Sequence, residues 1–366
     1  DTKPKASEYK YTMSVSPLDC MGCGECVTVC PVGAITMVPQ ADEADEQPVF
    51  NYLVANVGRK DAAGSDLTVK GSQFNQPLLE FSGSCAGCAE TSYARLITQL
   101  FGEHMYISNA TGCSSIWGGP AATSPFTVNK DSKKGPAWCN SLFEDNAQHG
   151  MGMEVGQKYL RDHAIASAKK AAEAGSAELK AAFTKFEETV NNTKENGPAA
   201  DALIAELQKA SGEDAKAALA LKDYLAKKSI WIFGGDGWAY DIGFGGLDHV
   251  LASGENVNVM VFDTEMYSNT GGQASKASNI GEVCQFAAAG KEVSKKSLAE
   301  IAMSYGYVYV AQIALGANMN QAVKVLAEAE AYNGPSLIIG YAPCELHGVK
   351  GGMNHCQDEM KAAVTA

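Results

Sequence analysis

The stretch SIWIFGGDGWAYDIGFGGLDHVLASGENVNVMVFDTEMYSNTGGQ, residues Ser229–Gln273, decides the fold. It opens with an apolar run of strand length and continues through a glycine-rich turn around Asp236 into a segment of helix length. A second apolar run follows at Val257–Asp263, and a polar cluster, Thr264–Thr270, comes directly after it. A strand, a turn, a helix and a second buried strand in this order are typical of an α/β sheet.

Other apolar runs extend this pattern over most of the chain. Helix-length segments separate most of them, which predicts a doubly wound parallel sheet of the α/β class. In such a sheet, ligands bind beyond the carboxyl ends of the strands. The runs that we expect to be strands are Met105–Asn109, Ile230–Gly234, Val257–Asp263, Val308–Ile313 and Ser336–Tyr341.

Composition limits the class of protein. The chain has 366 residues, enough for a large core and two domains, and its formal net charge of −13 argues against nucleic acid as a partner. No apolar run reaches the roughly 18–20 residues that a membrane span needs. Eleven cysteines in a chain of this size, several at metal-ligand spacings, indicate a reducing cytoplasm and an oxygen-sensitive metal or cluster site.

A run of cysteines near the start carries the first chemical signal. Cys20, Cys23, Cys26 and Cys30 have the spacing C-x2-C-x2-C-x3-C, and Pro31 follows. This is the bacterial ferredoxin pattern, in which the last cysteine binds a second iron-sulfur cluster. A zinc knuckle is the alternative. Because the run occurs once, the module either holds one cluster or has its other half before Asp1, and we favour the second.

A second cysteine set is predicted from strand ends. Cys85 and Cys88 form a C-x2-C pair, which alone fits a redox pair or half of a zinc site. Cys113 follows the first predicted strand and Cys344 follows the last, so both are expected at the same edge of the sheet. We therefore choose Cys85, Cys88, Cys113 and Cys344 as ligands of a further [4Fe-4S] cluster. The cysteines left out lie in loop or helical sequence: Cys139, Cys284 and Cys356.

The polar residues of the opening stretch predict a magnesium site. Asp236 follows one strand and Thr264 the next, so both are expected at that same edge. One carboxylate, a hydroxyl and a backbone carbonyl, completed by diphosphate oxygens and water, suit the octahedral oxygen coordination of Mg²⁺. The glycines around Asp236 and the following helix allow close approach of a phosphate. An ordinary strand-turn-helix without a ligand is the alternative.

The remaining sequence suggests how the chain is divided. We predict a partial ferredoxin-like segment at 1–51, a linker at 52–77 and an α/β domain at 78–366. Residues 123–152 read as a loop. A region rich in Ala, Lys and Glu, about 154–228, has strong helix formers at helical spacing and predicts a helical insertion with a solvated face.

Several motifs in this order resemble one family. SCAGCAET, NATGCSSIWGG, PAWCNSLFEDNAQHGMGM, YAPCELHG and the opening stretch are similar to the pyruvate:ferredoxin (flavodoxin) oxidoreductases, as is the ferredoxin run. The resemblance covers nearly the whole chain. It implies the C-terminal part of such an enzyme, with half of the ferredoxin-like domain and the domain that binds thiamine diphosphate.

The resemblance also implies roles for individual residues. Asp236, Thr264 and the carbonyl of Met266 would bind Mg²⁺, and Asn269 would face the substrate. Cys85, Cys88, Cys113 and Cys344 would hold the cluster nearest the thiamine, in agreement with the strand-end argument. Cys113 and Asn269 are the candidate catalytic residues. The residues that would line the cofactor are Glu90, Cys113, Gly235, Asp236, Gly237, Trp238, Thr264, Glu265, Met266, Tyr267, Ser268 and Asn269.

The implied activity is oxidative decarboxylation of pyruvate to acetyl-CoA and CO₂, with single electrons passing through [4Fe-4S] clusters to ferredoxin or flavodoxin. A second α/β domain that binds the aminopyrimidine does not fit into this chain. We therefore expect an interior or cropped segment of a long enzyme, inactive alone and working as a homodimer. The alternatives are an oxidoreductase for another 2-oxo acid, such as oxalate or 2-oxoglutarate, and a non-catalytic electron-relay subunit.

Overall fold

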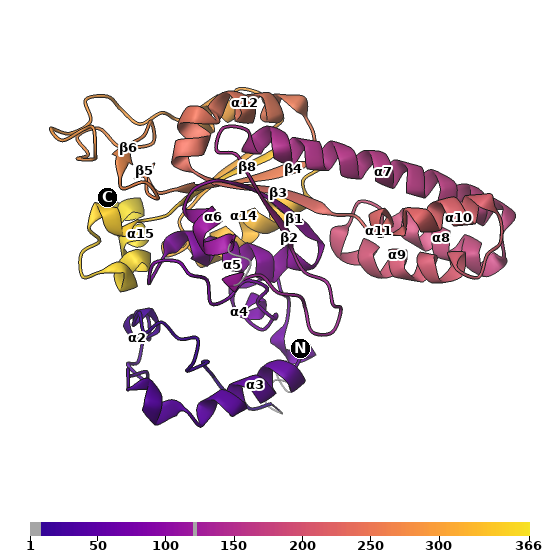
Figure 1. The fold of residues 1–366 in the computed structure, drawn as a ribbon, viewed down its shortest axis with the longest axis horizontal. Coiled ribbons are helices and arrows are strands. Elements are labelled where there is room, and N and C mark those ends of the chain that lie inside the picture. The colour runs from indigo at the N-terminus through magenta and orange to yellow at the C-terminus, as the bar shows by residue number, and fades with distance from the viewer. Residues whose placement is uncertain (1–8, 120–122) are drawn as a thin grey trace.

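A six-stranded parallel sheet with the order β2-β1-β3-β4-β8-β7 forms the centre of the molecule (Figure 1). The computed structural model describes residues 9–119 and 123–366. The predicted α/β class is confirmed, and each predicted strand is present to within one residue at either end. The strands are β1 Met105–Ala110, β2 Ala137–Ser141, β3 Ser229–Gly235, β4 Val257–Asp263, β7 Tyr309–Ile313 and β8 Ser336–Tyr341.

The central strands are apolar along their whole length because both faces of the sheet are covered. Trp231 and Phe233 of β3 pack into one core cluster, while Ile230 and Ile232 pack into the other. Successive side chains of a strand point to opposite faces, so a strand buried on both sides needs an uninterrupted apolar run. One cluster contains α5 Ala89–Phe101, α6 Cys113–Gly118, α14 Met319–Ala331 and α15 Cys356–Thr365, and the other contains α12 Phe244–Ser253 and α13 Leu298–Met303.

The prediction of a loop over 123–152 is wrong in part. Residues 137–141 form β2, which pairs in parallel with β1 at the edge of the sheet. Cys139 consequently lies in a strand, not in loop or helical sequence. The sequence AWCNS has no apolar run because an edge strand has one neighbour and its side chains here are exposed or half-buried. Hydrophobic pattern alone therefore does not reveal it.

The helical insertion is present and begins earlier than predicted. Its first helix starts at Asn146, where the amide Nδ2 donates to the carbonyl of Phe233 at 2.9 Å. A side chain at Gly150 would place Cβ 2.4 Å from Ile232, so glycine lets this helix approach the sheet closely. The helices then project from the sheet around a separate apolar cluster (Figure 1). They are α7 Asn146–Ala174, α8 Ala177–Thr189, α9 Thr193–Leu207, α10 Glu213–Ala220 and α11 Lys222–Leu225.

Glu154 of α7 makes stability depend on pH. Burial, followed by the charge of Glu255, raises its pKa from 4.5 to about 7, against the opposing charges of nearby cations. Because the folded state holds the proton of Glu154 more tightly, its contribution to the free energy of unfolding is fully present below pH 4.5. This contribution is lost as the pH rises through the folded-state pKa of about 7. We expect Glu154→Gln to reduce the fall in Tm between pH 5 and pH 8. The exposed Glu173→Gln is the control, and an equal fall in both variants would contradict this assignment.

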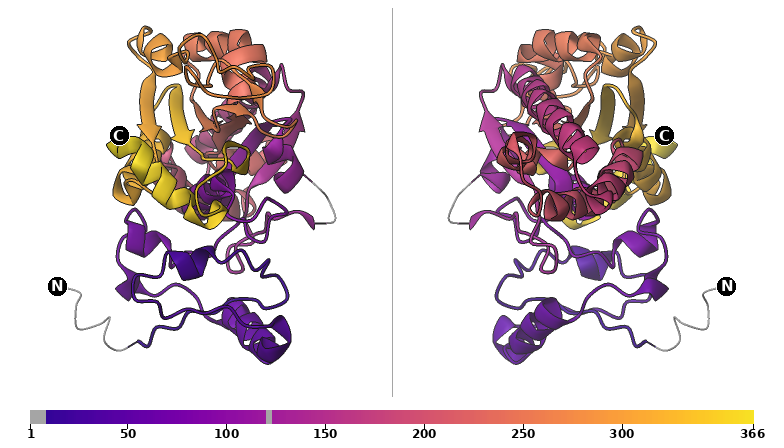
Figure 2. Two further views of the ribbon diagram at one scale, coloured as in Figure 1. Left: turned by 90° about the vertical axis from the view of Figure 1, so that its left-hand side faces the viewer. Right: turned by 90° about the vertical axis from the view of Figure 1, so that its right-hand side faces the viewer.

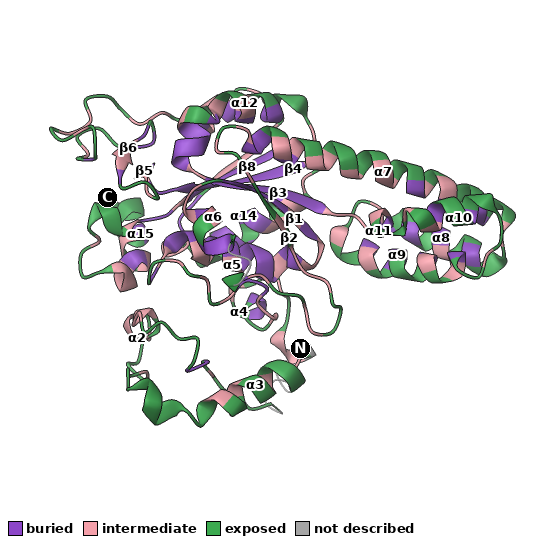
Figure 3. Cartoon of the chain, viewed as in Figure 1, coloured by how far each residue is buried: buried purple, intermediate pink, exposed green. Residues whose placement is uncertain are grey.

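The segment before the sheet lies below it and is largely exposed (Figures 2 and 3). Its helices are α2 Glu25–Thr28, α3 Glu46–Asn56 and α4 Val69–Ser72. Neither α2 nor α3 contains a buried residue. The predicted boundary at residue 51 falls inside α3, so the helix continues into the predicted linker; the division into domains stays a prediction. Within the described residues, no helix combines the length and apolarity that crossing a membrane requires.

Candidate functional site

Oxygen atoms gather where β3 and β4 end. Asp236 follows β3 and Thr264 follows β4, and because these strands are neighbours their ends meet. The hydroxyl Oγ1 of Thr264 lies 2.8 Å from Oδ1 of Asp236 and 3.0 Å from the carbonyl oxygen of Met266. The structure thus brings together the three groups that the sequence and the resemblance nominate for Mg²⁺.

The spacing and charge of these groups fit a magnesium ion. Ligands about 2.0–2.1 Å from Mg²⁺ in an octahedron stand about 2.9 Å from their neighbours, close to the 2.8 and 3.0 Å separations observed. Asp236 is 1% exposed. Its burial, with the nearby charge of Asp263, raises the pKa of its carboxyl to about 8. A divalent cation would favour the ionised form that this environment disfavours.

Within residues 9–119 and 123–366, no three His, Cys, Asp or Glu side chains are grouped so as to hold one metal ion. The oxygen cluster at Asp236 contains a single residue of these types, because its other oxygens come from a hydroxyl and a carbonyl. Magnesium commonly takes one or two carboxylates and completes its shell with phosphate and water. The cluster therefore agrees with a site of that kind.

Ser275 is a functional candidate that the sequence analysis missed. Its hydroxyl donates to Oδ2 of Asp236 at 2.6 Å and accepts from the amide of Ala277 at 3.0 Å. Both carboxylate oxygens of Asp236 therefore accept a hydrogen bond, Oδ1 from Thr264 and Oδ2 from Ser275. Ser275 lies far along the chain in a loop without a motif, so no spacing in the sequence indicated it.

We expect Ser275→Ala to weaken binding of Mg²⁺ with thiamine diphosphate. Removing a group that orients a metal ligand typically lowers metal affinity about 10- to 100-fold, and Ser275 donates directly to Asp236. Isothermal titration with both ligands measures the change. Ser253→Ala, at the surface end of α12, is the matched control because its hydroxyl donates to the carbonyl of Val250. Unchanged affinity in Ser275→Ala would rule out this role.

The glycine-rich turn permits two aromatic rings to pack beside Asp236. A Cβ at Gly234 would lie 2.3 Å from the Trp238 ring, and one at Gly237 would lie 2.6 Å from the Tyr267 ring. A π-helical turn, η5 Gly237–Ile242, follows Asp236. Trp238 is fully buried, and its Nε1 has no hydrogen-bond partner among the described residues. The two rings form a wall beside the oxygen cluster.

The loop after β4 is held in an uncommon conformation. Glu265 has φ of 62°, in the left-handed region, and its side chain shares Lys295 with Asp263. Nζ of Lys295 lies 2.7 Å from Oδ2 of Asp263 and 2.9 Å from Oε1 of Glu265. Lys295 therefore offsets two carboxylates, and one of them, Asp263, is close enough to Asp236 to raise its pKa. Asn269 is exposed farther along this loop, and its side chain makes no hydrogen bond with the described residues.

The second cysteine set is also assembled at strand and helix ends. Cys85 and Cys88 precede α5, Cys113 begins α6 after β1, and Cys344 follows β8. Burial is the largest cause that raises the pKa of Cys113, followed by the charges of Glu90 and of the other three thiols, which are therefore within electrostatic range of Cys113. Burial likewise raises the pKa of Cys88 to about 12.

Cys85 is exposed and Cys88, Cys113 and Cys344 are half-buried. Thiols bind metal as thiolates, so positive iron would offset what this partial burial disfavours. The four sulfurs need not converge on one point, because in a cubane each thiolate binds its own iron. The set therefore fits a [4Fe-4S] cluster in its donor chemistry. Glu90 lies beside it, where burial raises its pKa to about 7 and its Oε2 accepts from Nε1 of Trp117 at 3.0 Å.

The turn after Cys344 reaches the oxygen cluster, where Nε2 of His347 hydrogen-bonds to the carbonyl oxygen of Thr264 at 2.5 Å. Burial is the main cause that raises the pKa of the Cys344 thiol, and it is opposed in part by the nearby hydroxyl of Ser268. The same hydroxyl lies 2.7 Å from Oγ1 of Thr264, which contacts Asp236. The candidate cation site and the candidate cluster site are therefore adjacent.

The first cysteine run lies apart from this site, in the segment below the sheet. Backbone amides surround its last thiol. The amide of Ala34 donates to Sγ of Cys30 at 3.2 Å, and this hydrogen bond is the largest cause of the lowered pKa of Cys30. A loop that favours thiolate is suited to ligation of iron. The four cysteines Cys20, Cys23, Cys26 and Cys30 are free, and each is exposed or half-buried.

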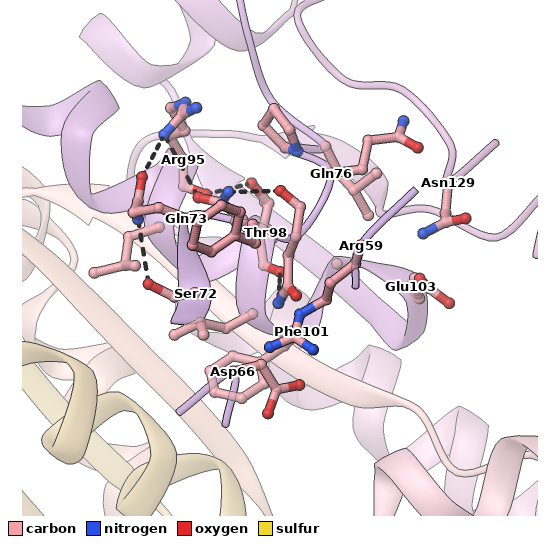
Figure 4. A pocket seen from close by; sticks show the side chains of 18 of the residues that line it. Arg59, Asp66, Ser72, Gln73, Gln76, Arg95, Thr98, Phe101, Glu103 and Asn129 are labelled. Carbon is pink, nitrogen blue, oxygen red and sulfur yellow. Dashed lines mark hydrogen bonds between the residues drawn. The ribbon is translucent and has the colours of Figure 1, made fainter. Parts of the chain in front are cut away.

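A wide cleft of about 3020 Å³ opens between the N-terminal segment and α5. Arg59, Asp66, Gln73, Arg95 and Phe101 lie around it (Figure 4). Neither Asp236 nor the thiols of the second cysteine set line this cleft. The oxygen cluster therefore lies outside this cleft.

Comparisons with known proteins agree with this assignment. The model for the thiamine pyrophosphate enzyme C-terminal TPP-binding domain matches residues 202–339, and the model for the 4Fe-4S binding domain matches residues 13–36. The chain is thus a thiamine-diphosphate-binding α/β protein with an iron-sulfur segment.

The relatives place it within that class. It is 54% identical to the pyruvate:ferredoxin oxidoreductase of Moorella thermoacetica, over 99% of this chain and 32% of that protein. It is 52% identical to the pyruvate-flavodoxin oxidoreductase of Klebsiella pneumoniae, over 99% of this chain and 31% of that protein. The chain belongs to the pyruvate:ferredoxin (flavodoxin) oxidoreductase family, and it spans about a third of the length of these relatives.

A solved structure shows a looser likeness. The 2-oxoglutarate:ferredoxin oxidoreductase from Magnetococcus marinus matches with 14% identity and a TM-score of 0.41, over 72% of this chain and 65% of that chain.

Proposed function

We propose that this chain is the diphosphate-binding and electron-relay part of an enzyme that converts pyruvate and coenzyme A to acetyl-CoA and CO₂. Its electron acceptor is ferredoxin or flavodoxin. The observation that carries the proposal is the hydrogen bond between Nε2 of His347, in the turn after Cys344, and the carbonyl oxygen of Thr264. A place for the cofactor's diphosphate and a place for a one-electron acceptor thus lie side by side. Thiamine diphosphate, when bound, supplies the electron sink that lets CO₂ leave.

The chain's own residues divide the work at the oxygen cluster. Asp236, the hydroxyl of Thr264 and the carbonyl of Met266 hold Mg²⁺, and Ser275 keeps the carboxylate of Asp236 in position. The buried ring of Trp238 and the half-buried ring of Tyr267 exclude water beside the diphosphate. Further residues that we assign to the cofactor's surroundings are Glu90, Cys113, Gly235, Gly237, Trp238, Glu265, Tyr267, Ser268 and Asn269. Asn269, which is exposed on its loop, is the residue that we propose faces the substrate.

The cysteines form two ligand sets in this proposal. Cys85, Cys88, Cys113 and Cys344 hold the [4Fe-4S] cluster nearest the thiamine, while Cys20, Cys23, Cys26 and Cys30 belong to the ferredoxin-like segment. Ferredoxin or flavodoxin receives electrons from that segment. The remainder of the same enzyme supplies the aminopyrimidine-binding domain, and the complete protein works as a homodimer in the cytoplasm.

Anaerobic assays of the complete enzyme test the proposal. Pyruvate and coenzyme A should reduce ferredoxin or flavodoxin with release of CO₂, whereas purified residues 1–366 should not. If the complete enzyme acts only on oxalate or 2-oxoglutarate, that acid, and not pyruvate, is its substrate. Failure of the complete enzyme to bind thiamine diphosphate with Mg²⁺ would support a non-catalytic relay instead.

A further inference from the structure

The turn between the last strand and the last helix contacts both cysteine loops. It consists of the 3-10 helix η7 Met353–His355 and the first residue of α15, Cys356. One side of this turn meets α2, which contains Cys26 of the ferredoxin-like run. The other side meets the loop that carries Cys85 and Cys88.

Polar contacts hold α2 on this turn. Nδ2 of Asn354 donates to Oγ1 of Thr28 at 2.8 Å, and the thiol of Cys356 lies 3.9 Å from Oε1 of Glu25. Cys356 is fully buried, although α2 itself has no buried residue. Figures 1 and 2 show α2 beside the C-terminal part of the chain in each view. The short helix is therefore positioned through its contact with the turn, because it has no core of its own.

The second loop fits the turn closely. A Cβ at Gly87 would lie 2.5 Å from the carbonyl oxygen of Met353 and 2.9 Å from its Cβ. Gly87 also has φ of 74°, which glycine adopts without strain. It lies between Cys85 and Cys88, so this contact determines where the loop of the second cysteine set rests.

We propose that residues 353–356 are a docking turn that fixes the two cysteine loops, 20–30 and 85–88, relative to each other, with Asn354 as its positioning residue. The role of this turn in electron transfer rests on the proposed function, whereas the docking contact does not. Clusters held by the two loops would exchange a single electron, which would oxidise the first and reduce the second with no bond or proton exchanged. Such transfer depends steeply on separation, and one shared turn keeps that separation constant.

Hydrogen exchange on the complete enzyme tests the docking directly. Thr28→Val removes the acceptor of Asn354 at nearly constant shape, Asn354→Ala removes the donor, and Thr28→Ser keeps the hydroxyl. We expect the two disruptive variants to raise amide exchange in peptides covering 20–30 about three- to tenfold, the equivalent of one hydrogen bond, and Thr28→Ser to stay near wild type. The reduction of ferredoxin by pyruvate should slow, while reduction of the near cluster by pyruvate stays at the wild-type rate.

Asn256→Ala is the control, since Nδ2 of Asn256 donates to Oδ1 of Asn333 in an exposed contact. Unchanged exchange in Thr28→Val and Asn354→Ala, or an equal rise in Asn256→Ala, would overturn the docking turn. Faster exchange with equal slowing of both reduction steps would also overturn it, because the contact would then serve general stability. A wild-type enzyme without pyruvate activity would refute the proposed function, whereas the exchange result would still decide the docking.

Discussion

Asp236→Asn is expected to abolish binding of Mg²⁺ with thiamine diphosphate and, at the same time, to stabilise the cation-free protein. Loss of an outer residue around a metal typically costs about 10- to 100-fold in affinity, so loss of the only carboxylate in the oxygen cluster should exceed 100-fold. The opposite effect on stability follows from burial. Asp236 is 1% exposed, and the amide of Asn keeps its shape without its charge.

The sign of the stability change depends on pH. The folded protein holds the proton of Asp236 up to a pKa of about 8, against an ordinary value of 3.8. The carboxyl therefore stabilises fully below 3.8, and this contribution is lost as the pH rises to 8. At pH 8 without Mg²⁺, Tm should be higher in Asp236→Asn than in wild type.

Adding Mg²⁺ and thiamine diphosphate should raise Tm in wild type alone, because only a protein that binds a ligand gains stability from it. Asp248→Asn provides a matched control on α12, where Oδ1 accepts from the hydroxyl of Tyr305 at 2.7 Å. It should keep the ligand response. A ligand-induced rise in Tm of Asp236→Asn equal to that of wild type would remove Asp236 from the cation site.

The central strands and the ends that carry Asp236 and Thr264 were predictable because burial on both faces leaves uninterrupted apolar runs. The edge strand β2 was not, since AWCNS is polar and has one neighbour in the sheet. The helical insertion was recognisable from composition. Its start was misplaced because Asn146 and Gly150 pack on the sheet without carrying an apolar pattern.

Parts of the site depend on contacts that no local pattern encodes. Ser275 reaches Asp236 through a loop, and His347, in the turn after Cys344, reaches Thr264 because β4 and β8 are neighbours. Strand order brings such residues together, and strand order is not visible in a list of apolar runs. Cys344 is predictable as a candidate because it follows an apolar strand. Cys139 lies in a polar edge strand that the sequence pattern does not reveal.

Cys344→Ser is expected to eliminate the paramagnetic signal of the near cluster in the reduced complete enzyme, whereas Cys356→Ser leaves it intact. A [4Fe-4S] cluster needs four thiolates, and a serine hydroxyl does not ionise readily enough to replace one. Cys344 belongs to the group of thiols whose charges affect Cys113. Cys356 is instead covered completely and faces Glu25, so it serves packing and docking.

Electron paramagnetic resonance of the two variants, with iron content measured in parallel, separates these roles. For Cys344→Ser, the signal of the ferredoxin-like segment acts as an internal standard, because its cysteines lie in another part of the chain. Cys356→Ser retains a donor toward Glu25, which makes it the matched comparison for loss of a thiol without loss of a ligand. If both variants lose the near-cluster signal equally, the loss does not mark Cys344 as a ligand, and its assignment to the cluster is wrong.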